Sequence, residues 1–97
     1  MPLPPLPVVF VRYGISERLP DRIEEMVTTP LERALVTLPR VTRVSSTTNH
    51  GTVDVKIHFQ EGATGQDLAL VTREIEELQF NSAVVVTSRT VAIRRSD

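Results

Sequence analysis

Residues 41–59, VTRVSSTTNHGTVDVKIHF, decide how this chain folds. Apolar and polar side chains alternate strictly over residues 52–60, which is the two-residue period of a strand with one buried face. The apolar positions are Val53, Val55, Ile57 and Phe59, and the polar ones are Asp54, Lys56, His58 and Gln60. Residues 41–48 are rich in Val, Thr and Ser, and Asn49-His50-Gly51 separates the two runs with residues that tolerate positive φ. The segment therefore predicts a β-hairpin.

An amphipathic helix is expected immediately before this hairpin. Pro20-Asp21 favours a helix start, because proline is tolerated in the first turn and acids suit the positive end of the helix. Apolar residues then recur at three- and four-residue steps, at Ile23, Met26, Val27, Leu31, Ala34, Leu35 and Leu38. Pro30 removes a backbone donor and clashes with the preceding turn, so we expect a kink near residues 27–29 and a helix end before Pro39.

The N-terminal part of the chain divides into a lead segment and a strand. Residues 1–7 contain four prolines, which predicts an extended lead segment ahead of a single domain over residues 8–97. Residues 8–13 are apolar except at Arg12, a pattern typical of a central strand that is covered on both faces.

A second helix and a last strand are expected after the hairpin. Thr64-Gly65-Gln66-Asp67 resembles a capping box, and the helix it opens buries Leu68, Val71, Ile75 and Leu78. Residues 83–87 and 90–94 are β-branched and alternate, which predicts a last strand with a bend at Ser88-Arg89.

The expected element order is β-α-β-β-α-β. This is the α+β ferredoxin-like split βαβ arrangement, a four-stranded antiparallel sheet with both helices on one face. The arrangement does not specify a function, because many unrelated activities occur on it.

Composition narrows the possible functions. Eleven basic and twelve acidic residues give a net charge of −1, so no basic excess favours nucleic acid as a partner. The chain has no cysteine, and its longest apolar run, residues 8–11, is far shorter than the roughly twenty residues of a membrane span. With 97 residues, one modest core is expected.

Candidate chemistry is sparse. The two histidines, His50 and His58, are interpreted as surface residues and Met26 as a core residue, so no metal site is predicted. No Ser, His and acid combination can be assembled, and the loop at residues 14–18 has a single glycine with which to cradle phosphate. We therefore predict neither an enzyme nor a cofactor-binding protein.

Several short blocks occur together in a characteristic order. They are Pro4-Pro5-Leu6-Pro7, Tyr13-Gly14, Val27-Thr28-Thr29-Pro30-Leu31-Glu32, Leu38-Pro39-Arg40-Val41, Ser45-Ser46, Gly51 and Phe59-Gln60-Glu61-Gly62-Ala63-Thr64. In this order the chain resembles the first periplasmic porter subdomain of resistance-nodulation-division (RND) transporters, the proton-driven efflux pumps of Gram-negative bacteria. The chain departs from the family pattern where Arg40 replaces the usual glycine, where Tyr13-Gly14 lacks an intervening proline, and where residues 81–85 lack Leu-Pro.

The resemblance implies a fragment of a trimeric inner-membrane pump, located in the periplasm, that contributes to a substrate channel. Residues 64–78 would form the pore helix that meets its trimer mates, and the open sheet face would be the channel wall. Its substrate-facing residues would be Phe10, Asp54, Ala92 and Arg94, with Asp54 and Arg94 supplying opposite charges. The implied partners are the remaining subdomains, trimer mates, a periplasmic adaptor protein and small amphiphilic substrates. The alternative is a free-standing ferredoxin-like ligand-binding or regulatory module that dimerises through its sheet.

Overall fold

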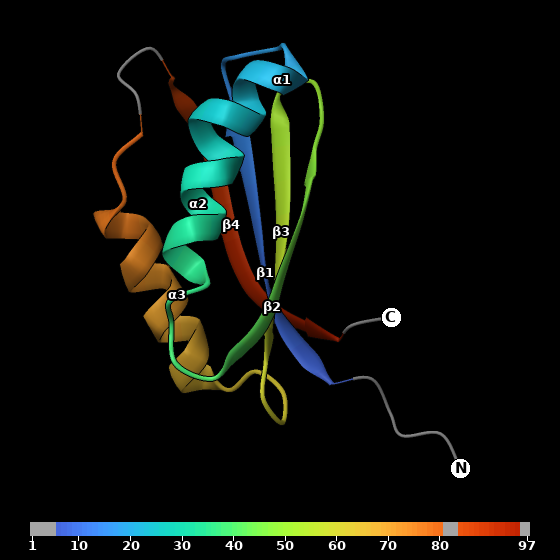
Figure 1. The fold of residues 1–97 in the computed structure, drawn as a ribbon, viewed down its shortest axis with the longest axis vertical. Coiled ribbons are helices and arrows are strands. Elements are labelled where there is room, and N and C mark those ends of the chain that lie inside the picture. The colour runs from blue at the N-terminus through green and yellow to red at the C-terminus, as the bar shows by residue number, and fades with distance from the viewer. Residues whose placement is uncertain (1–5, 81–83, 96–97) are drawn as a thin grey trace.

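Four antiparallel strands form one sheet in the order β2-β3-β1-β4 (Figure 1). The computed structural model describes residues 6–80 and 84–95. The strands are β1 (Pro7–Ile15), β2 (Val41–Thr48), β3 (Thr52–Phe59) and β4 (Val86–Arg95). All three neighbouring pairs are antiparallel, and β1 lies between β3 and β4. The predicted ferredoxin-like arrangement is confirmed.

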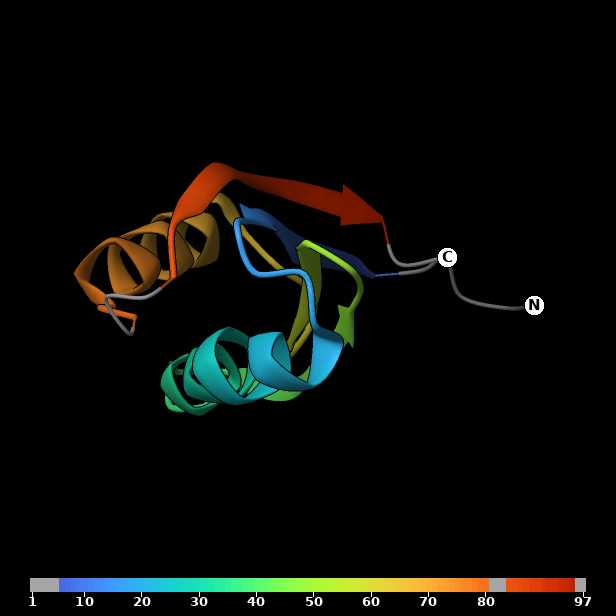
Figure 2. The same ribbon diagram turned by 90° about the horizontal axis from the view of Figure 1, so that it is seen from above.

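The helices cover one face of this sheet. The first helical segment consists of α1 (Pro20–Ile23), η1 (Glu24–Thr28) and α2 (Thr29–Leu35), which follow one another without a break. The second helix is α3 (Gly65–Glu77). Figure 2 shows both on the same side of the sheet, with its other face bare of helices. The first helix was expected to continue to Leu38, but it ends at Leu35, and Leu38 packs against the core from a turn.

The disturbance expected from Pro30 takes the form of a π-helical segment. In η1 the backbone N–H of Thr29 donates to the carbonyl of Glu24, five residues earlier. Pro30 lacks an N–H and its ring crowds the carbonyl four residues before it, so a wider preceding turn relieves the clash. This turn also carries Thr28, a completely buried residue whose hydroxyl lies 2.9 Å from that of Thr48 on β2.

The core lies between the sheet and the helices. Every residue that the patterns place at its centre is completely or almost completely buried, namely Leu31, Leu35, Val55, Ile57, Val71 and Ile75. The central strand β1 is also buried on its other face, where Val8 and Phe10 are 2% and 7% exposed. This explains why residues 8–11 are uniformly apolar.

The turn between β2 and β3 has the expected form. Gly51 has φ of +103°, and a Cβ there would lie 2.9 Å from a guanidinium nitrogen of Arg18. The backbone N–H of Ile15 donates to the Gly51 carbonyl at 2.8 Å, which ties the turn to β1. Glycine at position 51 therefore allows both the positive φ and the close approach of the Arg18 side chain.

The irregularity expected in the last strand at Ser88-Arg89 is present one residue earlier, at Thr87-Ser88. β4 is a single strand from Val86 to Arg95, but Gly14 pairs with Ser88 and the next residue, Ile15, pairs with Val86, so Thr87 is the extra residue of a β-bulge on β4. A Cβ at Gly14 would collide with the hydroxyl of Ser88. The absence of a side chain at Gly14 thus leaves room for the bulged residues Thr87 and Ser88 of β4. Ala83, predicted as part of this strand, lies outside the described residues.

Two loops at one end of the sheet are joined through Arg40 and Asp67. The predicted capping box is confirmed: Thr64 accepts from the Asp67 backbone, and the Asp67 carboxylate accepts from the Thr64 backbone at 2.9 Å. The same carboxylate oxygen accepts from Arg40 Nη1 at 2.6 Å, and Arg40 Nη2 donates to the carbonyls of Gln60 and Gly62. Burial opposes the charged form of Asp67, but the bonds from Thr64 and Arg40 outweigh it and lower its pKa.

Candidate functional site

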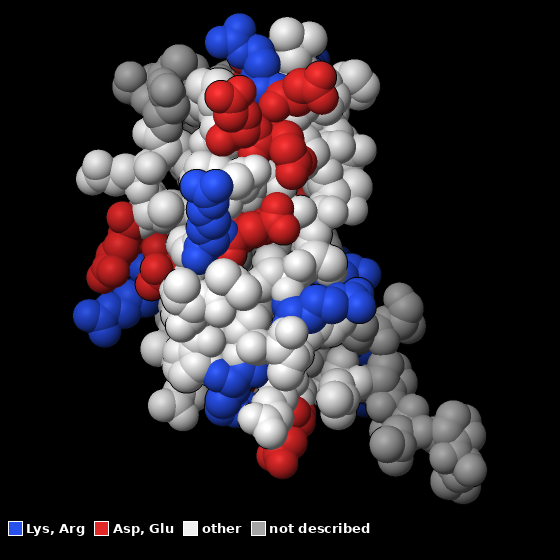
Figure 3. Space-filling view, in the orientation of Figure 1, with Lys and Arg blue, Asp and Glu red and all other residues white. Residues whose placement is uncertain are grey.

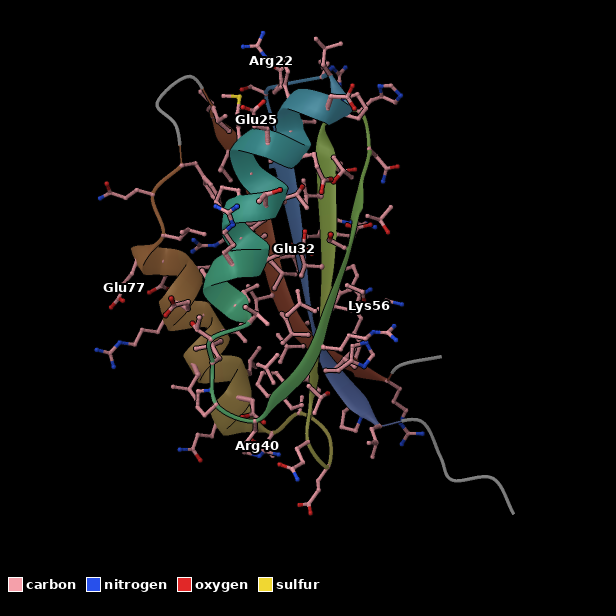
Figure 4. All side chains as sticks on the ribbon, viewed as in Figure 1. Arg22, Glu25, Glu32, Arg40, Lys56 and Glu77 are labelled. Carbon is pink, nitrogen blue, oxygen red and sulfur yellow. The ribbon has the colours of Figure 1, made fainter. Side chains whose placement is uncertain are left out.

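The sheet face opposite the helices is the candidate site, and we call it the helix-free face. The strand register places twelve side chains on it: Val8, Phe10, Arg12, Arg43, Ser45, Thr47, Asp54, Lys56, His58, Thr90, Ala92 and Arg94. Figure 4 shows Lys56 projecting away from the helices, whereas Glu25, Glu32 and Glu77 project from the helical side. All four residues predicted to face substrate, Phe10, Asp54, Ala92 and Arg94, lie on this face.

Phe10 forms the apolar centre of the helix-free face. In the register it lies between Lys56 on β3 and Ala92 on β4. The guanidinium carbon of Arg94 lies 4.4 Å from the ring centroid, and that of Arg12 lies 5.7 Å from it. Both distances fit cation–π contacts. The ring is therefore covered by two arginines and leaves little apolar surface for a ligand.

Asp54 is held by Arg12 across the β1–β3 pair. Arg12 Nε donates to Oδ1 at 2.7 Å and Nη2 donates to Oδ2 at 3.1 Å, a bidentate arrangement between directly opposed residues. The bond to the carboxylate and its charge raise the pKa of Arg12. The charge of Asp54 is consequently matched by Arg12, and it does not face Arg94 as an independent opposite charge.

His58 lies among cations on the same face. It follows Lys56 in the side-chain alternation of β3 and pairs with Arg43 of β2. Its Nε2 is buried and has no hydrogen-bond partner among the described residues. Burial lowers the pKa of His58, and the charges of Arg43 and Lys56 lower it further, so the imidazole is neutral at pH 7.

Charge is divided between the two sides of the molecule. Within the described residues, the helix-free face carries the cations Arg12, Arg43, Lys56 and Arg94 and a single carboxylate, that of Asp54. The helices carry most of the acids, namely Asp21, Glu24, Glu25, Glu32, Asp67, Glu74, Glu76 and Glu77, beside Arg22, Arg33 and Arg73. Figure 3 shows acidic side chains gathered over α1 and η1. The helix-free face is thus locally cationic in a protein of net charge −1.

The site is an open surface. Within residues 6–80 and 84–95 there is no pocket, and no group of three or more metal-ligating side chains lies together. In the same part of the chain, no helix combines the length and the apolarity that a bilayer span requires. A ligand would therefore need a second wall from another part of an assembly, because one flat face leaves most of a ligand in water.

The outer surface of α3 is a second candidate contact region. Its inward side is formed by Asp67, Val71 and Ile75. Exposed residues follow the opposite side at helical spacing, at Gln66, Ala69, Arg73, Glu76 and Glu77. One face of α3 therefore packs on the sheet while the other remains available.

Comparison with known proteins identifies the family. The sequence model of the AcrB/AcrD/AcrF family matches residues 2–88, most of the chain. The chain belongs to the AcrB/AcrD/AcrF family. This confirms the resemblance to RND porters that the short blocks indicated, and it points to a transporter rather than an enzyme.

A solved structure supports the same architecture. The chain superimposes on the crystal structure of a heavy metal efflux pump with a TM-score of 0.74 over 93% of its length, at 16% identity. At that identity the likeness concerns the fold. The chain spans only 9% of the length of that pump. No curated protein matches the sequence.

Membership of the AcrB/AcrD/AcrF family gives the unusual residue Arg40 a structural meaning. The resemblance to RND porters led us to expect glycine at this position, and Arg40 has φ of +68°, in the left-handed region that glycine adopts without penalty. Arginine is accommodated here with a side chain that joins the two loops. Sequence reasoning noticed the substitution but missed the partner Asp67, which lies 27 positions away.

The cationic residues of the helix-free face were also missed as a set. The strict alternation along β3 exposes Lys56 and His58 beside Asp54, and this signal was available in the sequence. Placing Arg12, Arg43 and Arg94 on the same face requires three registers, those of β2 with β3, β3 with β1, and β1 with β4.

Proposed function

We propose that this chain is a porter subdomain of a proton-driven RND-type efflux pump. The observation that carries the proposal is the match to the AcrB/AcrD/AcrF family over residues 2–88. In such a pump the segment would lie in the periplasmic part of an inner-membrane transporter of a Gram-negative bacterium. It would be a scaffold and a channel wall without catalytic activity of its own, working with the remaining subdomains and a periplasmic adaptor protein.

The helix-free face is the proposed channel wall. Phe10, Asp54, Ala92 and Arg94 all lie on this side, which no helix of the described chain covers. A single face can enclose only part of a small amphiphilic substrate, so we infer that neighbouring subdomains complete the site. In this arrangement residues 1–7 would lead into the folded domain, residues 8–97.

The exposed side of α3 is the proposed contact with trimer mates. Its small residue Ala69 lies near the middle of the exposed stripe, where a symmetry-related helix could approach closely. The acids near the C-terminal end of α3 lack a basic residue in the last turn, an arrangement that does not favour an isolated helix. A contact made in an assembly would account for it.

Cysteine labelling of the intact transporter tests the channel role. Thr90 is exposed and lies on the helix-free face next to Ala92 in the alternation of β4. Thr90→Cys, in an otherwise cysteine-free full-length transporter, should lose efflux of an amphiphilic substrate when a bulky maleimide is attached. Arg33→Cys, exposed on α2, is the matched control and should keep its efflux after labelling. Equal efflux from both labelled variants would contradict the channel role.

The alternative of a free-standing ligand-binding or regulatory module is not favoured. Such a module would share the fold, but the family match concerns a segment of a transporter.

A further inference from the structure

The cationic residues of the helix-free face include side chains that have no acidic partner within residues 6–80 and 84–95. Of the five charged residues on this face, Arg12 and Asp54 neutralise each other through two hydrogen bonds. Among the described residues, no carboxylate lies within 4.0 Å of Arg43, Lys56 or Arg94. The face therefore keeps three uncompensated positive charges on strands β2, β3 and β4.

These three cations lie on β2, β3 and β4, on the same side of the sheet as Phe10 and His58. Lys56 is directly opposite Phe10, and Arg94 lies over the Phe10 ring from the other side. Arg43 pairs with His58, which follows Lys56 in the alternation of β3. The outer surface of the Arg94 guanidinium is thus a flat cationic platform, and guanidinium groups stack on aromatic rings as well as binding carboxylates.

We propose that the helix-free face binds small amphiphilic anions, aromatic carboxylates in particular, with the carboxylate between Lys56, Arg94 and Arg43. The proposal rests on the proposed function for its physiological meaning, since it names the substrate class that this channel wall would accept. The occupant is an anion because the face carries an excess of cations, and it is small and flat because the centre of the face is a single ring covered by arginine.

A pair of probes of opposite charge tests this on the 97-residue chain. 2-Naphthoate and 2-naphthylmethylammonium present the same ring system, one with a negative and one with a positive group. We expect naphthoate to shift backbone amides of β1, β3 and β4 in ¹⁵N NMR spectra, with a dissociation constant on the order of millimolar because one wall encloses little of the ligand. The cationic probe should bind more weakly by at least about threefold, and added salt should weaken naphthoate binding.

Charge-neutralising variants locate the anion. Arg94→Gln and Lys56→Gln should each weaken naphthoate binding by about two- to fivefold, the range of one exposed ion pair. Arg33→Gln removes a cation from α2 and should leave binding unchanged. Arg94→Gln also removes the guanidinium that lies over Phe10, so weaker binding by this variant could come from lost packing. Lys56→Gln removes a charge without removing that contact, and so tests the charge alone. Equal binding by all three variants would overturn the proposal.

His58 supplies a readout that depends on charge. Arg43 and Lys56 lower its pKa, and Val8, the neighbour that β1 presents to it, is uncharged. An anion bound between these cations should raise the pKa of His58, followed through its ring protons. An unchanged pKa at saturating naphthoate would contradict the placement.

The two proposals fail separately. Naphthoate binding to the isolated chain, combined with full efflux after labelling of Thr90→Cys, would leave the anion site and remove the channel role. Lost efflux after labelling, combined with tighter binding of the cationic probe, would leave the channel role and remove the anion site.

Discussion

Ile57 and Lys56 are adjacent in β3 but face opposite sides of the sheet. Ile57 is completely buried in the core, and Lys56 is exposed on the helix-free face. On the helix-free face, side chains also contact one another across strands: Arg12 and Arg94 both extend over the Phe10 ring. A residue's role in this protein depends first on which side of its strand it occupies.

The two substitutions Ile57→Ala and Lys56→Ala should separate these environments. Ile57→Ala should lower the free energy of unfolding by about 2–4 kcal/mol, through lost contacts and a residual cavity. Lys56→Ala should change it by less than about 0.5 kcal/mol. Urea unfolding followed by circular dichroism measures both. Similar values for the two variants would mean that the assigned face of β3 is inverted.

At the scale of elements, the turn before β2 and the loop before α3 behave as one unit. Arg40 accepts from the Gln60 backbone at 2.7 Å and its side chain bonds to Asp67 and Gly62. The left-handed backbone conformation of Arg40 reduces the stability that these bonds provide, because a residue with a side chain is strained in that conformation. Arg40 thus combines a local cost with a long-range gain.

A pair of variants separates the two contributions. Arg40→Ala removes the side-chain bonds and keeps the backbone strain, whereas Arg40→Gly removes both. We expect both variants to be less stable than the natural chain, and Arg40→Ala to be less stable than Arg40→Gly by about 1 kcal/mol. Chemical denaturation provides the comparison. If Arg40→Ala equals or exceeds Arg40→Gly in stability, the conformation at residue 40 is not left-handed.

At the scale of the whole molecule, one layer of helices on one sheet surrounds one core. Residues from β1, β3, α2 and α3 meet in that core, so no element can bury its apolar side alone. The opposite face needs no cover to keep Phe10 out of water, because the neighbouring arginines already do so. The layer has a core of its own, although the chain spans only 9% of the length of the heavy metal efflux pump on which it superimposes.

The 97-residue chain should therefore unfold reversibly in a single cooperative transition. Thermal melts followed in the far ultraviolet and by tyrosine fluorescence should coincide, because Tyr13 is buried on the central strand. Two separate transitions, or a gradual melt, would show that the sheet requires its neighbouring subdomains.

The sequence by itself determined the hairpin, the helix cap, the core faces of β3 and of the two helices, and the ferredoxin-like order. These features depend on periodicity and on contacts between residues close in the chain, such as Thr64 with Asp67. The motifs that indicated the family could also be recognised in the sequence, because each is a short run of neighbouring residues.

Only the tertiary structure decided the character of the candidate site. Arg12 and Asp54 are 42 positions apart, and Phe10 meets Arg94 across the β1–β4 pair. Such contacts depend on the register of strands joined by long connections, and a shift of one residue would send each side chain to the other face. The sequence therefore named the residues of the face, while the register decided that Asp54 is neutralised and that the remaining charge is positive.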